Sequence, residues 1–203
     1  MRPVSRSALV VAILVGLASG PARAADVSLV APDELRPLLV RHLDFLERRA
    51  DRRLDDAGRI ALLRRARKEI GEILATEGYF SPAIEGEDGD DGDFRIVVKP
   101  GRRTTIASVE LRFAGDLGRD EGERPARLAA LRAAWSLPAG QPFRQADWDA
   151  AKQRLLDAIG AREYAAAAIS DSQALIDPAA TTAALHVEVD SGPVFRFGPL
   201  EIT

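Results

Sequence analysis

Apolar residues in the first half of this chain change from helical spacing to strict alternation at a Gly-Tyr-Phe, residues 78–80. Over residues 59–76 they recur every three or four positions, which predicts an amphipathic helix with a solvated basic face. After Pro82 they alternate around Ile84 and again over residues 94–98, which predicts two strands joined by an exposed turn at residues 85–93. The predicted helix has these two faces: apolar Ile60, Leu63, Ile70 and Leu74; basic Arg64, Arg65, Arg67 and Lys68.

The same order returns in the second half of the chain. Five apolar positions correspond at a shift of 85: Leu63, Ile70, Leu74, Tyr79 and Ile84 match Trp148, Leu155, Ile159, Tyr164 and Ile169. At a shift of 91, residues 94–101 match 185–192, and residues 105–111 match 196–202. The change of shift predicts a connecting loop six residues longer in the second copy. One supersecondary unit, repeated, therefore accounts for the chain after its first segment.

Each copy reads as strand, helix, helix, strand, strand. Opening strands are predicted at residues 27–31 and 104–113, and second helices at 59–76 and 144–160. The first helices have these apolar faces: Leu35, Leu38, Leu39, His42, Phe45 and Leu46, with Asp33 as the cap; and Leu128, Leu131 and Trp135. The predicted fold class is α+β, with two helices packed on a small mixed sheet. The predicted domains are residues 25–103 and 104–193, with 194–203 as the first strand of a third unit.

The first 24 residues have the pattern of a secretory signal peptide. Arg2 and Arg6 precede an apolar run, and Ala22 and Ala24 occupy the positions that a signal peptidase reads. We therefore expect export, with cleavage after Ala24. The net charge of −3 and the absence of a basic stripe make nucleic acid a poor partner, and the absence of cysteine excludes disulfides.

Catalytic and metal-binding patterns are missing from the sequence. The acidic stretch 85–93 lacks the spacing of a twelve-residue calcium loop, and His42 and His186 have no neighbouring ligands. No serine lies in a nucleophile elbow. Trp135 and Trp148 are expected to pack inside the protein rather than stack on a sugar. The sequence predicts a protein that is not an enzyme and needs no cofactor.

Several stretches resemble the POTRA domains of outer-membrane assembly and translocation proteins. They are EGYFSPAI, FRIVVKPGRRTTIASVELRFAG and SGPVFRFGPLEIT; SLPAGQPFRQADWDAAKQRLLDAI is similar to the TamA branch. The resemblance implies a periplasmic location and outer-membrane protein precursors as clients. It also implies a TamB-like inner-membrane-anchored partner and a C-terminal outer-membrane barrel, which we do not expect within these residues. The second copy departs from the pattern, because Glu163-Tyr164-Ala165 replaces Gly-Tyr-Phe.

The resemblance also implies that the second strand of each unit is a sheet edge, where a client strand adds by backbone pairing. The candidate edge residues are Ser81, Ala83, Ile84 and Glu85, and Ala167, Ile169 and Asp171. Structural roles are predicted for Gly78, Tyr79, Phe80, Gly101, Tyr164 and Gly192, with Gly78 ending the helix and the aromatic pair sealing it against its sheet. Three alternatives stay open: a two-partner-secretion module, a BamA-type module, and a small periplasmic enzyme or ligand-binding protein with a pocket.

Overall fold

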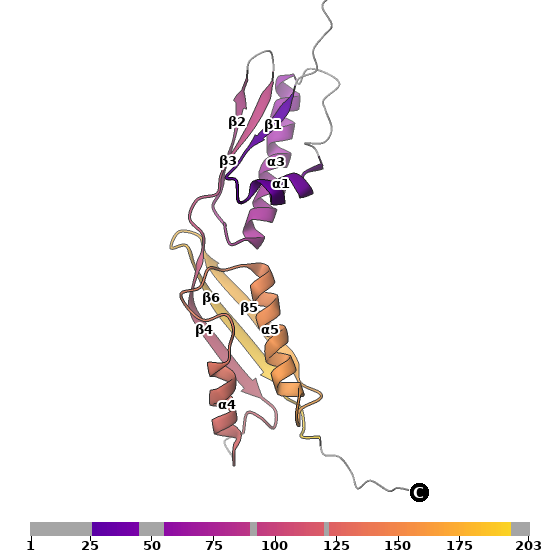
Figure 1. Ribbon diagram of the computed structural model, residues 1–203, viewed down its shortest axis with the longest axis vertical. Helices are drawn as coiled ribbons and strands as arrows, with labels where there is room; N and C mark the ends of the chain where they lie inside the picture. Colours follow the sequence, from indigo (N-terminus) through magenta and orange to yellow (C-terminus); the bar gives the residue numbers. More distant parts are fainter. Residues whose placement is uncertain (1–25, 45–54, 90–92, 120–121, 196–203) are drawn as a thin grey trace, which may run out of the picture.

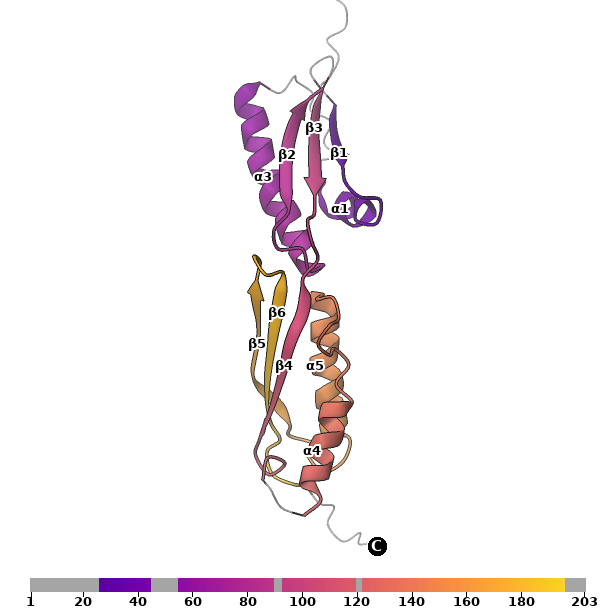
Figure 2. The same cartoon turned by 90° about the vertical axis from the view of Figure 1, so that its left-hand side faces the viewer.

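Two α+β units lie end to end along the long axis of the molecule (Figures 1 and 2). The computed structural model describes residues 26–44, 55–89, 93–119 and 122–195. The proposed signal peptide with Ala22 and Ala24, Phe45, Leu46, and most of the proposed third unit lie outside these ranges. Among the described helices, none is long and apolar enough to cross a membrane.

Unit one has a three-stranded sheet in the order β1-β3-β2. Its elements are β1 (Val27–Val30), α1 (Arg36–His42), α3 (Asp56–Thr76), β2 (Ala83–Asp88) and β3 (Phe94–Lys99). The central strand β3 pairs parallel with β1 and antiparallel with β2. The inner side chains of β3 alternate with exposed ones and pack on the helices, which is the pattern of a sheet with one covered face.

Unit two repeats this topology with longer strands. Its elements are β4 (Thr105–Ala114), α4 (Arg124–Ala133), α5 (Gln145–Gly160), β5 (Ala168–Asp177) and β6 (Thr182–Asp190). The strand order is β4-β6-β5, again parallel on one side of the central strand and antiparallel on the other. Figure 2 shows both helices on one face of this sheet. The predicted β-α-α-β-β order and α+β class are therefore confirmed.

Several predicted packing contacts are also confirmed. The rings of Trp135 and Trp148 meet edge to face, with centroids 6.1 Å apart, in the core of unit two. Tyr164 is fully buried there. Gly101 and Gly192, matched at the shift of 91, both have positive φ, at 77° and 62°. The repeat in the sequence thus reproduces the backbone conformation at both positions.

Some predictions about the first copy are wrong. Leu35, not Asp33, occupies the N-cap of α1, and Asp33 instead pairs with Arg36 at 3.9 Å. His42 is exposed, because the apolar stripe continues through Leu43, which is buried. Ile60 is 60% exposed, whereas the buried residues of α3 are Ala66, Ile70 and Leu74.

The extra residues of the second copy lengthen its hairpin strands, not its loop. β2 and β3 have six residues each, whereas β5 and β6 have ten and nine. The predicted turn at 85–93 is also wrong in its first part, because residues 85–88 continue β2 and pair with β3. Charged residues here occupy an exposed strand, which sequence alternation alone did not distinguish from a turn.

Candidate partner-binding edges and the joint between the units

The second strand of each unit is a sheet edge, as expected from the resemblance. β2 and β5 each have one neighbour, β3 and β6. Ser81 and Ala167 lie just before these strands, while the other candidate residues lie within them. An edge strand has backbone N–H and C=O groups that its own sheet leaves unpaired, and these groups can receive another strand.

One side-chain contact shows which backbone N–H and C=O groups of β2 point away from β3; we call these residues the outward row. Nε of Arg67 donates to the O of Ile84 at 3.0 Å, so this carbonyl faces away from β3. Alternate residues of an antiparallel strand face the same way, so Gly86 and Asp88 share this direction. A Cβ on Gly86 would lie 2.4 Å from the ring of Phe94, which explains the glycine in this row.

Helix α3 covers both ends of this outward row. Besides Arg67 at Ile84, Nη1 of Arg59 donates to the side-chain Oδ1 of Asp88 at 2.7 Å, and the Arg59 side chain is only 24% exposed. Figure 2 shows α3 alongside β2. A strand arriving at this edge must displace a guanidinium from the backbone acceptor that it needs, so the β2 edge is protected.

The outward row of β5 follows from the other side of its sheet. The N–H of Ser191 donates to the O of Ala114, so the backbone groups of Ser191 and of every second residue before it point toward β4. The backbone groups of the residues between them, which include His186, point toward β5. His186 pairs with Gln173, which therefore takes part in the ladder. The outward residues of β5 are Ser172, Ala174 and Ile176.

The β5 edge is longer and less guarded than the β2 edge. Within the described residues, no side chain of α5 donates to a β5 carbonyl, and Leu175 on the solvent face is 64% exposed. The ladder shifts register between Ile169 and Asp171, so the stretch proposed from the sequence holds a bulge. Sequence reasoning missed residues 172–177, which it assigned to a loop; their exposure alternates in the structure, but their polar and apolar residue types do not alternate in the sequence.

Gly78 ends α3 as predicted, and it also forms the joint between the units. Its φ is +90°, its N–H donates to the O of Ala75, and the N–H of Tyr79 donates to the O of Leu74. This is the Schellman pattern of a helix C-terminus. A Cβ here would lie 2.2 Å from the O of Phe143 in unit two, so the position needs glycine for its close approach as well.

The aromatic pair after Gly78 divides between the two cores. Tyr79 packs on the core of unit one, as predicted, but Phe80 packs on the core of unit two, with its ring 5.8 Å from that of Phe143. The prediction that both seal the helix against its own sheet is therefore wrong for Phe80. Because the second core supplies the apolar surface, Phe80 fastens one unit to the other.

Polar contacts surround this aromatic bridge. Glu77 accepts hydrogen bonds from Nε and NH2 of Arg144 at 3.0 and 3.1 Å, and these bonds and its charge raise the pKa of Arg144. Nε of Arg103 donates to the O of Glu77 at 2.8 Å, and the N–H of Thr104 donates to the O of Gly78. The joint is thus held by backbone, charge and an aromatic contact.

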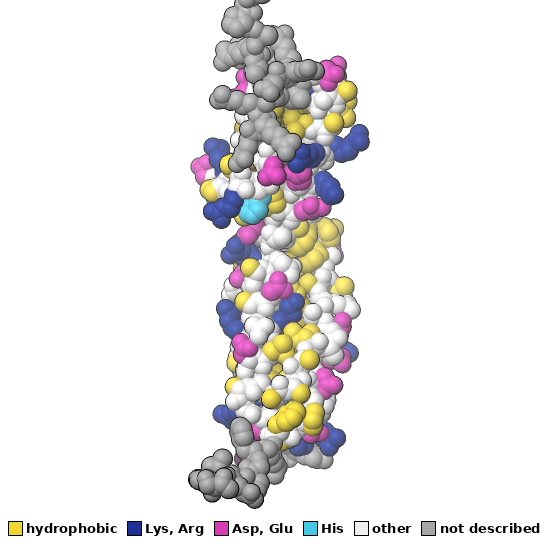
Figure 3. Space-filling model, turned by 90° about the vertical axis from the view of Figure 1, so that its right-hand side faces the viewer, with side chains coloured by type: hydrophobic (Ala, Val, Ile, Leu, Met, Phe, Trp, Pro, Cys, Tyr) yellow, Lys and Arg dark blue, Asp and Glu magenta, His cyan; other side chains and the backbone are white. Residues whose placement is uncertain are grey.

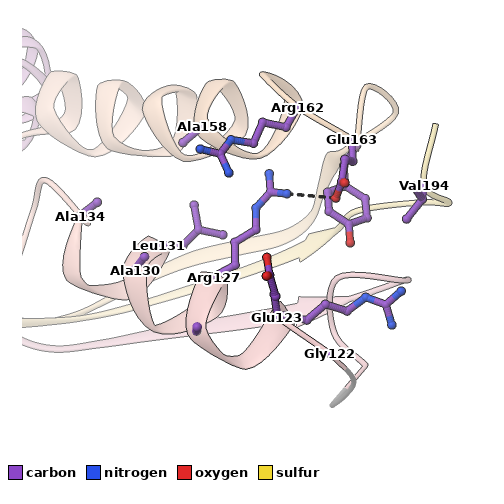
Figure 4. A pocket seen from close by; sticks show the side chains of 13 residues that line it. Gly122, Glu123, Arg127, Ala130, Leu131, Ala134, Ala158, Arg162, Glu163 and Val194 are labelled. Carbon is purple, nitrogen blue, oxygen red and sulfur yellow. Dashed lines mark hydrogen bonds and ion pairs between the residues drawn. The ribbon is translucent and has the colours of Figure 1, made fainter. Parts of the chain in front are cut away.

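A hollow of about 1030 Å³ lies at the far end of unit two, between α4 and the segment after α5 (Figure 4). Its lining carries Arg124, Arg127, Arg162, Glu123 and Glu163, and the guanidinium of Arg127 lies 5.1 Å from the centre of the Tyr164 ring. The lining has no serine, cysteine or histidine. In the described part of the chain, no group of His, Cys, Asp and Glu is placed to hold a metal ion. The hollow therefore offers charged side chains of both signs for binding.

Comparison with known proteins bears on the architecture only. No protein-family model matches the sequence, and the search of curated proteins finds no match. Among solved structures, the chain is similar to POTRA3-5 of BamA from Haemophilus influenzae, at 23% identity and a TM-score of 0.38, covering 62% of this chain and 51% of that one. It is also similar to POTRA1-2 of the periplasmic domain of Omp85 from Anabaena: 13% identity, TM-score 0.40, covering 85% and 96%. It is similar as well to CdiB from Escherichia coli, at 10% identity and a TM-score of 0.38, covering 88% of this chain and 29% of that one. The chain spans about half the length of the Haemophilus structure.

Proposed function

We propose that this chain is a periplasmic POTRA-type module of an outer-membrane assembly or secretion protein, of the TamA-like branch. It recruits partner proteins or unfolded β-barrel precursors by adding their strands to its sheet edges. The proposal rests on the sequence resemblance, on the two β-α-α-β-β units, and on the ten-residue open edge of β5. A TamB-like protein is the proposed fixed partner.

The β5 edge carries this proposal better than the β2 edge. Strand addition needs a row of free backbone groups and makes little demand on the client's side chains, which suits precursors of many sequences. β5 provides such a row at Ser172, Ala174 and Ile176, whereas on β2 the side chain of Arg67 occupies the outward O of Ile84. We therefore place recruitment chiefly on unit two.

Adjacent proline substitutions test the proposal. Ser172→Pro removes an outward N–H, while Gln173→Pro removes a ladder N–H from the same strand, so the second is a matched control. With a fluorescent ten-residue strand peptide from an outer-membrane barrel, we expect Ser172→Pro to weaken binding at least tenfold and to keep a native circular dichroism spectrum. Gln173→Pro should instead lower stability. Unchanged binding by a folded Ser172→Pro protein would contradict strand addition at β5.

A further inference from the structure

The far end of unit two repeats a backbone contact of the joint. At the joint, the N–H of Thr104 donates to the O of Gly78 at 2.8 Å. The shifts of 91 and 85 match Thr104 with Phe195 and Gly78 with Glu163, and the N–H of Phe195 donates to the O of Glu163 at 2.7 Å. The same backbone contact therefore occurs after the second helix of each unit.

At the far end of unit two, the position that carries an acidic residue at the joint carries a basic one. Glu77, which holds Arg144 at the joint, corresponds at the shift of 85 to Arg162. Arg162 is exposed, lines the hollow, and has no hydrogen bond or ion pair with any described residue. Figure 4 shows its side chain running back along α5, with the guanidinium beside Ala158. Arg127 is itself engaged, with Glu163 at 3.5 Å and with the O of Ile159 at 3.2 Å, so Arg162 is the cation left for a partner.

We propose that the hollow is the docking surface for a further β-α-α-β-β unit that places an Asp or Glu where unit two places Arg144. That acidic side chain pairs with Arg162, as Arg144 pairs with Glu77. The inference does not depend on strand addition at β5, since it concerns how units are joined rather than what they recruit.

The same charge excludes the units described here as occupants. Arg144 corresponds at the shift of 85 to Arg59, so both units carry arginine at the docking position. A second copy of either unit would set arginine against Arg162, and like charges at such a contact disfavour association. Arg162 therefore selects a different unit and opposes stacking of identical ones.

The second joint is expected to be wider and more polar than the first. Glu163 has a side chain where Gly78 has none, and Ala165 stands where Phe80 bridges the two cores. The new unit cannot approach as closely and gains no aromatic bridge, so charge contributes a larger share of its specificity. The sequence of residues 196–202, which matches 105–111, is that of an opening strand.

A charge-exchange cycle tests the proposal. The chain through Val194 is extended by a second copy of residues 104–193, with residue 162 as Arg or Glu and position 144 of the added copy as Arg or Glu. We expect both opposite-charge chains to be more stable than both like-charge chains. Exposed ion pairs predict a coupling of about 1.4- to 5-fold in the unfolding equilibrium constant of the added unit, lost in about 1 M salt.

The matched control is the same cycle at Glu77 and Arg144, where the contact distances are 3.0 and 3.1 Å. Urea unfolding followed by amide hydrogen exchange measures the added unit separately from the others, and circular dichroism confirms that it folds. Four equally stable chains, beside a measurable coupling in the control cycle, would overturn the proposal. Greater stability of the two like-charge chains would overturn it as well.

Discussion

The two units share one topology and treat their exposed edges differently. In unit one, β2 is six residues long, Arg67 of α3 donates to the outward O of Ile84, and Arg59 of α3 pairs with the side chain of Asp88. In unit two, β5 is ten residues long, and its outward row has no such donor from α5 in the described structure. The repeated scaffold thus preserves the packing positions, whereas the two copies diverge at their sheet edges, which core packing does not constrain.

The largest expected loss of stability comes from Gly78, where the backbone of unit one closely approaches that of unit two at the joint. Gly78→Ala should cost about 3 kcal/mol, because it combines left-handed backbone strain with a Cβ placed against the O of Phe143. Gly140→Ala is the matched control, since Gly140 has a similar φ of +87° but nothing within 4 Å of its Cβ. It should cost only about 1 kcal/mol. Guanidinium unfolding measures both, and equal losses would show that the close approach of the units contributes nothing.

Substitutions at Phe80 and Tyr79 test which hydrophobic core each aromatic side chain stabilises. Phe80→Ala should destabilise unit two by about 2 kcal/mol, less than a fully buried phenylalanine, because its side chain is half-buried. Tyr79→Ala should act on unit one instead. Hydrogen exchange read by mass spectrometry locates the loss. Faster exchange confined to β1–β3 in the Phe80 variant would contradict the bridge.

Removing Arg67 tests whether its side chain is what keeps strand peptides from binding at β2 rather than β5. Arg67→Ala frees the O of Ile84, so unit one should lose about 1 kcal/mol of stability and gain strand-peptide binding at β2. Arg64→Ala is the control, because Arg64 is exposed on the same helix. Fluorescence anisotropy with the strand peptide gives the number of binding sites. A variant that still binds one peptide, on β5 alone, would show that Arg67 does not guard the edge.

Acid should affect a contact that only unit two has. A hydrogen bond from Nε2 of Gln145 lowers the pKa of Asp149, with a smaller contribution from Lys152. Because the folded pKa lies below the unfolded one, the stabilisation is present at neutral pH and is lost as pH falls through the lowered value. The matching positions of unit one are Ile60 and Arg64, which cannot form this pair.

Gln145→Ala should therefore raise the pKa of Asp149 toward its ordinary value and cost about 0.3 kcal/mol at pH 7. The difference from the unaltered chain should vanish in acid, below both pKa values. Carboxyl NMR titration measures the pKa, and unfolding at pH 7 and at a pH below the measured folded pKa gives the stability. An equal deficit at both pH values would contradict this assignment.

The sequence predicts the scaffold well because burial leaves a periodic signal. Helical spacing located α3 and α5, and the shift of 91 matched Gly101 with Gly192, which both have positive φ in the structure. The edge of β5 was misplaced, because a bulge at Ile169 and an exposed strand beyond it break the alternation on which the prediction depended. Phe80 was assigned to the wrong core, because sequence order does not reveal which unit an aromatic side chain at a boundary will contact.

We propose that β5, and not β2, receives an incoming strand. Amide exchange measured by NMR, with and without the barrel-strand peptide, tests this residue by residue. We expect the peptide to slow exchange at the N–H groups of Ser172, Ala174 and Ile176 and to leave exchange at Ile84 and Gly86 unchanged. Protection of Ile84 and Gly86 with none at the three β5 residues would contradict it.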